Sequence, residues 1–331
     1  MIRRLLMSAV ACVLIIGGAQ SQSKNLIVNG TFEAALGGES LPEGWFRFAE
    51  PGEGYKFTVG VGGRSGKALL IEGAGQYGGV VSTRIELDRA QRYAARGYVK
   101  IEGDTNATAT VKLDYYAADG KFLGSSVSGF ITPTHKGWQV VGVCDKQGEF
   151  SEAKSIAAVV ALTGKGKAWF DDLELIASPA SPGNLLTNGS IDAVVADKPT
   201  QYYMGTSEGG KVTMTANAQN PKDGSYALNL KGNSEWAVAG HERVKFDKSK
   251  TYTLSGFARA RTGTAQIKID YFEGDKYLGM TFSDEVTGSE WTRRVVVSSA
   301  SEYPTATHIS ATCVGLGEMD CDFDGLVLMA K

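Results

Sequence analysis

The chain has 331 residues, with 34 Lys and Arg against 36 Asp and Glu, so its formal net charge is −2. This balance gives no electrostatic basis for binding nucleic acid or an anionic membrane surface. Glycine is abundant, and short runs of Val, Ile, Thr, Tyr and Phe alternate with polar residues. Such alternation predicts an all-β protein.

The first residues have the pattern of a secretory signal peptide. Arg3 and Arg4 precede an apolar run, Leu5 to Ile16, and a stretch of small residues follows. That order predicts a signal peptide over residues 1–21, and hence a secreted, periplasmic or cell-surface protein of bacterial type. The run is too short to cross a bilayer and no later segment is long and apolar enough, so we expect no membrane insertion. Cys12 leaves lipid anchoring as an alternative, although "SAVAC" matches a lipobox poorly.

Internal repetition is the most informative feature of the rest of the chain. "NLIVNGTFEA" recurs as "NLLTNGSIDA", and "VKLDYYAADGKFLG" recurs as "IKIDYFEGDKYLG". Residues 77–93 align without a gap with residues 236–252, and residues 149–171 align with residues 302–324. The unit is roughly 150 residues long, the size of a complete domain. We therefore predict module 1 over residues 24–177, a linker over 178–183 and module 2 over 184–331.

Strand alternation in module 1 separates core-facing side chains from a second, mixed set. The second set is Arg96, Tyr98, Lys100, Lys112, Asp114 and Tyr116. A pyranose has an apolar face that stacks on aromatic rings and a rim of hydroxyls that hydrogen bond to charged groups. The mixture predicts a sugar-binding sheet face; the alternative is a solvated or covered face. Tyr77, Trp236 and Trp45 are further candidate platforms, although Trp45 could equally close the end of the core.

The ordered series of motifs in each copy resembles a known family. "NLIVNGTFE", "PEGW", "GKAL", "YAARGYVK", "YYAADGKFLG", "GW" and "WFDDLEL" follow one another through module 1. This series is similar to carbohydrate-binding modules of the cellulose- and xylan-binding type, which have a galactose-binding-domain-like jelly-roll fold. The resemblance implies two tandem β-sandwiches, a glycan site on a concave sheet or in the loops, and a structural Ca²⁺ near the first and last strands.

Acids repeated at the ends of the two copies suit that implied calcium. They are Glu33 and Asp171 in module 1, and Asp192 and Asp324 in module 2. Calcium takes six to eight oxygen ligands from carboxylates and carbonyls. The alternative is that these carboxylates cap backbone N–H groups. Module 2 has Gly325 where module 1 has a second acid, Asp172, so we expect the first acid to be structurally required and Asp172 to be dispensable or an extra ligand in module 1 only.

Cys313 and Cys321 flank "VGLGEMD", which we interpret as a hairpin turn centred on Gly317. Across such a hairpin the two cysteines would face each other, and in a secreted protein that predicts a disulfide. The alternative is two buried thiols.

No catalytic constellation is evident in the sequence. His135, His241 and His308 are isolated and lack metal-ligand spacing. No nucleophile elbow, phosphate-binding loop or dinucleotide fingerprint occurs. We therefore expect a protein that is not an enzyme, with glycoside hydrolysis by repeated acids as the remaining catalytic alternative.

The leading hypothesis is a secreted, non-catalytic protein that binds polysaccharide through tandem modules, which would gain avidity on a polymer. Its partners would be a glycan and a separate secreted enzyme or envelope component. The alternative hypothesis is a structural or adhesive cell-envelope protein whose modules bind protein or act as spacers.

Overall fold

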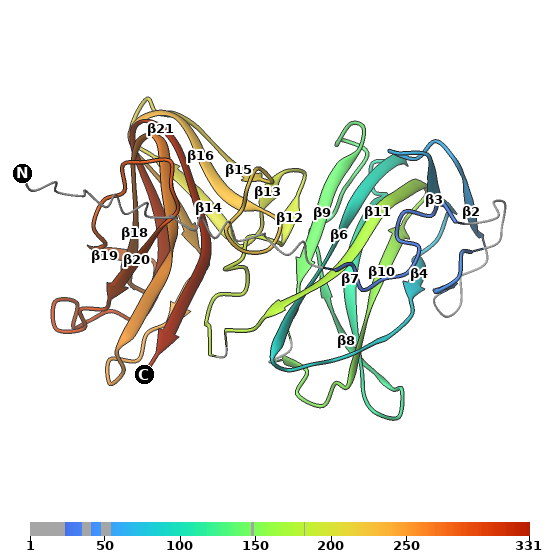
Figure 1. Cartoon of the computed structure of the whole chain (residues 1–331), viewed down its shortest axis with the longest axis horizontal. Coiled ribbons are helices and arrows are strands. Elements are labelled where there is room, and N and C mark those ends of the chain that lie inside the picture. Colours follow the sequence, from blue (N-terminus) through green and yellow to red (C-terminus); the bar gives the residue numbers. More distant parts are fainter. Residues whose placement is uncertain (1–23, 35–40, 48–53, 147–148, 182) are drawn as a thin grey trace, which may run out of the picture.

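The computed structural model describes residues 24–34, 41–47, 54–146, 149–181 and 183–331. These residues form β-strands and turns and contain no α-helix, as predicted for an all-β chain (Figure 1). No helix in the described ranges is long and apolar enough to span a membrane. The predicted signal peptide lies outside the described residues.

Module 1 has two facing sheets. The first, which we call the front sheet, runs in the order β1 (Trp45–Arg47), β4 (Gly78–Ser82), β10 (Ser155–Thr163), β7 (Thr108–Tyr116) and β8 (Phe122–Val127), with β5 (Ile85–Glu86) also paired to β10.

We call the second sheet the back sheet. Its order is β13 (Lys198–Pro199), β12 (Val194–Val195), β9 (Gln139–Cys144), β6 (Gln91–Gly103), β11 (Gly166–Pro179), β3 (Lys67–Gly73) and β2 (Tyr55–Val61). Apolar residues of both sheets meet in one core, as in a β-sandwich.

Module 2 has the same two layers, but its longest strands pass through both of them. These strands are β16 (Ala227–His241), β18 (Tyr252–Glu273) and β21 (His308–Ala330). Register shifts interrupt their pairing between Ser234 and Trp236 in β16, and between Ala260 and Thr264 in β18, where the strands cross from one layer to the other.

Shorter strands complete each layer of module 2. The front layer adds β14 (Tyr202–Thr206), β17 (Val244–Lys245) and β19 (Lys276–Phe282); the back layer adds β15 (Lys211–Asn217) and β20 (Thr292–Val297).

The repeated "NL" motif attaches the start of each module to its last strand. The Asn25 side chain accepts hydrogen bonds from the N–H groups of Ile27 and Leu175 and donates one to the Leu173 carbonyl. Asn184 makes the same contacts in module 2. Because one amide side chain pairs three backbone groups, asparagine recurs at this position.

The predicted hairpin between the two cysteines is wrong. Cys313 and Cys321 both lie in β21, where Cys313 is paired with Ala239 and Ile267 in the front layer and Cys321 with Leu230 and Ala260 in the back layer. Both are buried free thiols, so the predicted disulfide is absent and the alternative of buried thiols is confirmed. The chain at Gly317 passes between layers, and the two residues therefore never face each other.

The modules meet through a short strand addition. β12, which belongs to the sequence of module 2, pairs with β9 of module 1 at Val195 and Val141, and the Ala196 N–H donates to the Val140 carbonyl at 2.9 Å. Val195 and Ala196 pack against the core of module 1, whereas Val140 packs against the core of module 2. Figure 1 shows β12 and β13 between the two sandwiches.

Candidate functional site

The outer face of the front sheet is crossed by a row of paired residues in each module. In module 1 the row comprises Phe46, Val81, Val159, Lys112 and Val127. In module 2 it comprises Tyr203, Gly240, Thr312, Lys268 and Phe282. In both rows the lysine lies on the strand next to the edge strand. Its neighbour on the inner side is β-branched (Val159 or Thr312), and its neighbour on the edge strand is apolar (Val127 or Phe282).

A lysine–aspartate pair with a buried carboxylate lies on this face in both modules. Lys112 Nζ is 3.5 Å from Asp114 Oδ1, to which the Ser125 hydroxyl donates at 2.5 Å. Asp114 is fully buried, and burial raises the pKa of its carboxyl although Lys112 opposes the shift. Its Oδ2 has no hydrogen-bond partner among the described residues. A buried acceptor without a partner is available to a ligand hydroxyl.

Module 2 repeats the pair with closer contacts. Lys268 Nζ lies 2.8 Å from Asp270 Oδ1, and the Thr312 hydroxyl donates to Asp270 Oδ2 at 2.7 Å. Both members of the pair are buried. The threonine comes from β21, at the position that Val159 has in module 1, so each module holds its aspartate with a different hydroxyl.

Aromatic rings flank the module 1 pair. The Lys112 ammonium lies 5.0 Å from the centre of the Tyr77 ring, and burial followed by the charge of Asp114 raises the pKa of the Tyr77 phenol. Tyr116 is covered by Arg84, whose guanidinium is 3.7 Å from the ring centre, and contacts Phe122 edge-on. Burial and the charge of Asp114 raise the pKa of Tyr116 to about 12.

The same arrangement recurs in module 2, where Trp236 is more exposed than its module 1 counterpart Tyr77. Arg243 lies 4.1 Å from the Phe272 ring, which contacts Tyr277 edge-on. Trp236, Tyr203 and Tyr277 are each exposed over more than 40% of their surface. Exposed rings beside a buried ion pair combine the stacking and hydrogen-bonding groups that a sugar requires.

A cleft of about 700 Å³ adjoins Tyr116 in module 1. Residues of β1, of the β4–β5 region and of β8 line it, including Phe46, Arg84 and Phe122. We call the outer face of each front layer, with its lysine–aspartate pair and rings, the front groove of that module; the cleft itself is described in module 1 alone.

The structure divides the predicted sugar-binding residues between two sheets. The front layers carry two groups of these residues: Lys112, Asp114, Tyr116 and Tyr77 in module 1, and Trp236 in module 2.

Arg96, Tyr98 and Lys100 lie on β6 in the back sheet, so the prediction that they share a face with Lys112 and Tyr116 is wrong. Trp45 is buried against Phe32 and donates its indole N–H to the Val28 carbonyl, as the core alternative described.

Sequence reasoning missed several residues of the grooves. They are Phe46, Arg84, Phe122, Tyr203, Arg243, Tyr277 and Phe282. The gapless alignment of residues 77–93 with 236–252 pairs Arg84 with Arg243, and a repeated arginine was therefore a readable signal. The aromatic residues were harder to predict. In pairs of adjacent aromatic residues, such as Trp45-Phe46 and Tyr202-Tyr203, the sequence does not show which of the two side chains points outward.

The predicted acidic residues converge on one turn in each module. The Asp171 carboxylate accepts hydrogen bonds from the N–H groups of Arg64 and Ser65, and Glu33 Oε1 accepts one from Lys67 at 2.7 Å. In module 2, Asp324 accepts from Lys222 and Asp223, and Asp192 accepts from Ser225.

These contacts are those of the capping alternative, because the turns present N–H donors to the carboxylates. Within the described residues no group of three or more His, Cys, Asp or Glu side chains could hold a metal. Burial raises the pKa values of Asp171 and Asp324 against the opposing hydrogen bonds. The predicted convergence of the acids is observed; the calcium itself stays a prediction.

The difference between the paired acids has a backbone cause. Asp172 has φ of 49° and its counterpart Gly325 has φ of 57°. This left-handed conformation favours glycine and is tolerated by aspartate. The residue type at the second position is therefore set by the backbone conformation rather than by a need for a carboxylate. The Asp172 side chain instead forms an exposed ion pair with Arg64 at 2.7 Å.

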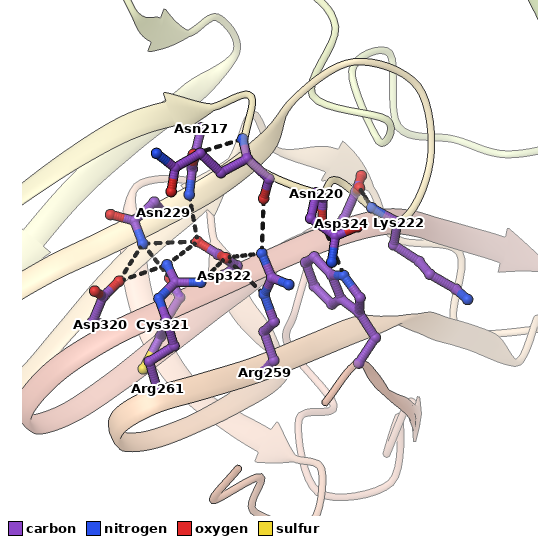
Figure 2. A network of polar contacts seen from close by, with 12 residues as sticks. Asn217, Asn220, Lys222, Asn229, Arg259, Arg261, Asp320, Cys321, Asp322 and Asp324 are labelled. Atoms are coloured by element: carbon purple, nitrogen blue, oxygen red, sulfur yellow. Dashed lines mark hydrogen bonds and ion pairs between the residues drawn. The ribbon is translucent and has the colours of Figure 1, made fainter. Parts of the chain in front are cut away.

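The back face of module 2 carries an extended ionic network (Figure 2). Asp322 is fully buried and receives hydrogen bonds from Arg259, Arg261 and Asn229 at 2.7 to 2.8 Å. Asp320 is held by the same Arg261 and Asn229 side chains; burial raises its pKa, but these hydrogen bonds outweigh burial and keep it well below its usual value. Each described carboxylate of this network is paired, which indicates a structural role.

Comparison with known proteins gives matches at the level of structure alone. No family model matches this chain, and no curated protein matches its sequence. Among solved structures, the chain is similar to the N-terminal CBM22-1–CBM22-2 tandem domain of Xyn10C from Paenibacillus barcinonensis, with 11% identity over 94% of this chain and 99% of that one, at a TM-score of 0.36.

Two further similarities cover single modules. The module TmCBM61, solved with β-1,4-galactotriose, is 15% identical over 45% of this chain and 99% of its own, at a TM-score of 0.33. The enzymatically active domain of tailspike protein 4 from bacteriophage CBA120 is 14% identical over 45% of this chain and 22% of its own, at a TM-score of 0.36. The neighbour that covers 94% of this chain is a tandem of two carbohydrate-binding modules.

Proposed function

We propose that this protein is a non-catalytic polysaccharide-binding protein and that the front groove of each module is its binding site. The observation that carries the proposal is the repeated lysine–aspartate pair, which lies beside aromatic rings at equivalent positions of the two copies and has a buried carboxylate in both. Each pair is preformed, because a serine or threonine hydroxyl and the lysine already hold the aspartate in place. A ligand therefore binds without having to reorganise these side chains.

The rings supply the second part of recognition. A sugar that stacks on Trp236 or Tyr277 removes apolar surface from water while its hydroxyls approach Lys268 and Asp270. Module 1 offers Tyr77, Phe46 and Phe122 in the corresponding places; Phe46 and Phe122 are exposed, but Tyr77 is more covered than its counterpart Trp236. We therefore expect module 2 to bind more tightly than module 1.

The test is affinity electrophoresis of the mature chain in gels containing soluble xylan, galactan or β-glucan. The groove variant combines Phe46→Ala, Phe122→Ala, Trp236→Ala and Tyr277→Ala, which truncate four exposed rings and leave the buried pairs intact. We expect the groove variant to lose affinity by about tenfold or more, the change that ~1.4 kcal/mol produces.

Trp169→Ala is the matched control, because this ring lies on the back sheet of module 1. It should leave retardation unchanged. Equal loss in the control and the groove variant would place the site elsewhere. Absence of retardation by any polysaccharide would contradict sugar binding and favour the structural or adhesive alternative. Release of reducing sugar during the assay would contradict the non-catalytic part.

Calcium binding at the acid turns is a further proposal, supported by the convergence of Glu33 with Asp171 and of Asp192 with Asp324 on single turns. In each module the two carboxylates would hold one ion. A ligand that binds only the folded state must raise the melting temperature. Melting curves that coincide in millimolar calcium and in chelator would leave backbone capping as the whole role of these acids.

Export is proposed from the sequence of residues 1–21. The expected result is a mature chain in the periplasm or medium whose mass lacks these residues. An intact N-terminus on cytoplasmic protein would contradict it.

A further inference from the structure

A second kind of pocket lies where the two modules meet. It has a volume of about 390 Å³, within the size range of small-ligand sites. Its lining includes Arg64, Arg96, Tyr98, Asp172 and Glu174 of module 1 and Tyr226 of module 2. We call it the junction pocket.

The pocket has fixed walls because the module contact is fixed. The pairing of β12 with β9 holds the modules together next to it, and Val140, which lines the pocket, packs against the module 2 core. Tyr226 is itself a buried member of that core, and the Arg96 guanidinium reaches across to within 5.5 Å of its ring centre. Neither module alone contains the complete pocket.

The charged groups of the pocket are balanced. Arg64 pairs with Asp172 at 2.7 Å, and Arg96 pairs with Glu174 at 2.5 Å. A free anion or cation would have to displace one partner of a pair, so the site does not favour an ion. Each pair instead offers both donors and acceptors at its rim, which suits an uncharged ligand with many hydroxyls.

Aromatic surface accompanies these pairs. Tyr98 lies in the pocket beneath the Arg64 guanidinium, 3.8 Å from the ring centre, and the Arg64 side chain is 44% exposed. An ion pair with this exposure contributes little to stability, so Arg64 can move aside at small cost. The ring face it covers would then be available to the apolar face of a pyranose.

We propose that the junction pocket binds one sugar residue of a neutral glycan, as a site separate from the two front grooves. This proposal rests on the proposed polysaccharide-binding function and extends it. A glycan branch or chain end held here contacts both modules at once. Bound sugar would therefore strengthen the contact between the modules as well as add to avidity.

The experiment uses the full mature chain with xylohexaose and β-1,4-galactotriose as probes, measured by saturation-transfer NMR and calorimetry. In the groove variant the front sites are weakened, and we expect weak saturable binding to remain. Adding Tyr98→Ala to that variant should lower the residual affinity by about tenfold. Ala218→Trp is a second test, because Ala218 is an exposed lining residue and the larger side chain fills the pocket without removing a contact.

Trp169→Ala in the same background is the control and should leave residual binding unchanged. Residual binding that is indifferent to both Tyr98→Ala and Ala218→Trp would overturn the junction site. The junction site would also be overturned if the native chain binds a probe and the groove variant binds neither. That result would leave the front grooves as the binding sites. If the groove variant binds as well as the native chain and Tyr98→Ala abolishes binding, the junction site stands and the front grooves fall. A native chain that binds neither probe would overturn both.

Discussion

The back faces of the two modules solve the same packing problem with different chemistry. In module 1, Trp169 of β11 is paired with Leu70 and Lys100, and the Lys100 ammonium lies 4.6 Å from its ring centre. The equivalent row of module 2 has Asp322 between Asn229 and Arg259, joined by hydrogen bonds and an ion pair of 2.7 Å (Figure 2). The cation thus meets an aromatic ring on the neighbouring strand in module 1, whereas in module 2 it meets a buried carboxylate there and lies 4.4 Å from the Trp291 ring centre.

The next row shows the same difference more simply. Lys167 pairs with Glu72 at 2.8 Å in module 1, and Asp320 pairs with Lys231 at 3.1 Å in module 2. Both pairs join the last strand to the same neighbouring strand, with the signs of the charges reversed. Cross-strand neighbours need to be complementary, but stability does not specify which partner carries which charge.

The front faces behave differently, since both retain lysine and aspartate in the same order on the same strand. A pair that only stabilises the sheet could reverse or change chemistry, as the back-face pairs do. A pair that presents a donor and an acceptor to a ligand has to keep each group in its place. The contrast supports a binding role for the front groove and a structural role for the back-face network.

The largest predicted effect follows from removing the centre of the module 2 network. Asp322→Ala leaves the buried Arg259 without its carboxylate, and we expect a loss of about 3–5 kcal/mol in the free energy of unfolding. Urea denaturation of the full chain measures it. Arg259→Lys together with Asp322→Trp installs the module 1 pair and should recover most of the loss, because lysine can then stack on the ring. A double variant as unstable as the single one would contradict the complementarity argument.

A smaller effect separates the paired acids of module 1. Asp171→Ala removes the acceptor of the Arg64, Ser65 and Asp172 N–H groups and should cost about 1–3 kcal/mol. Asp172→Gly copies module 2; it relieves a left-handed aspartate and loses one exposed ion pair, so the change should stay within about 1 kcal/mol. Equal losses in the two variants would refute the assignment of the first acid as the structural one.

His241 of module 2 gives the protein a pH dependence that its module 1 counterpart, Ser82, does not. Burial lowers the pKa of His241, with only partial opposition from its contact with the Glu242 carbonyl. The folded state therefore resists protonation, and stability is lost as pH falls below the unfolded pKa of about 6.5, by at most ~1.4 kcal/mol per pH unit. Melting temperatures from pH 7.5 to 5 should fall more for the native chain than for His241→Gln. Parallel curves would show that another group controls the decline.

The smallest effect concerns the reversed pairs. Lys231→Glu places like charges next to Asp320, and Asp320→Lys should restore the pair in the orientation of module 1. A double-mutant cycle should give a coupling of about 0.2–1 kcal/mol, because the Lys231 side chain is largely exposed. A coupling of zero would mean that this row contributes only through β-pairing.

The all-β class and the two copies could both be predicted from the sequence. Each depends on local alternation or on the repeat, both of which are visible in one dimension. The same signals led to the lysine–aspartate pair and to Tyr77 and Trp236. They did not lead to the arginines and exposed rings around them, since these become neighbours only across strands.

The two errors share one physical cause, which is that the local sequence does not show to which layer a residue belongs. Alternation shows whether a side chain faces inward or outward, but a sandwich has two outward faces. Tyr98 and Tyr116 both point outward, yet from opposite sheets. Likewise the glycine turn between the cysteines of β21 resembles a hairpin in sequence, whereas the chain there crosses between layers.

The sequence by itself determined the strands, the inward faces and the duplication, because hydrophobic periodicity and repeated motifs are properties of neighbouring residues. Only the tertiary structure decided which strands share a sheet, which outward residues form a groove and how module 2 completes the β9 edge of module 1. These outcomes depend on contacts between residues far apart in the chain, whose pairing is set by the packing of the whole sandwich.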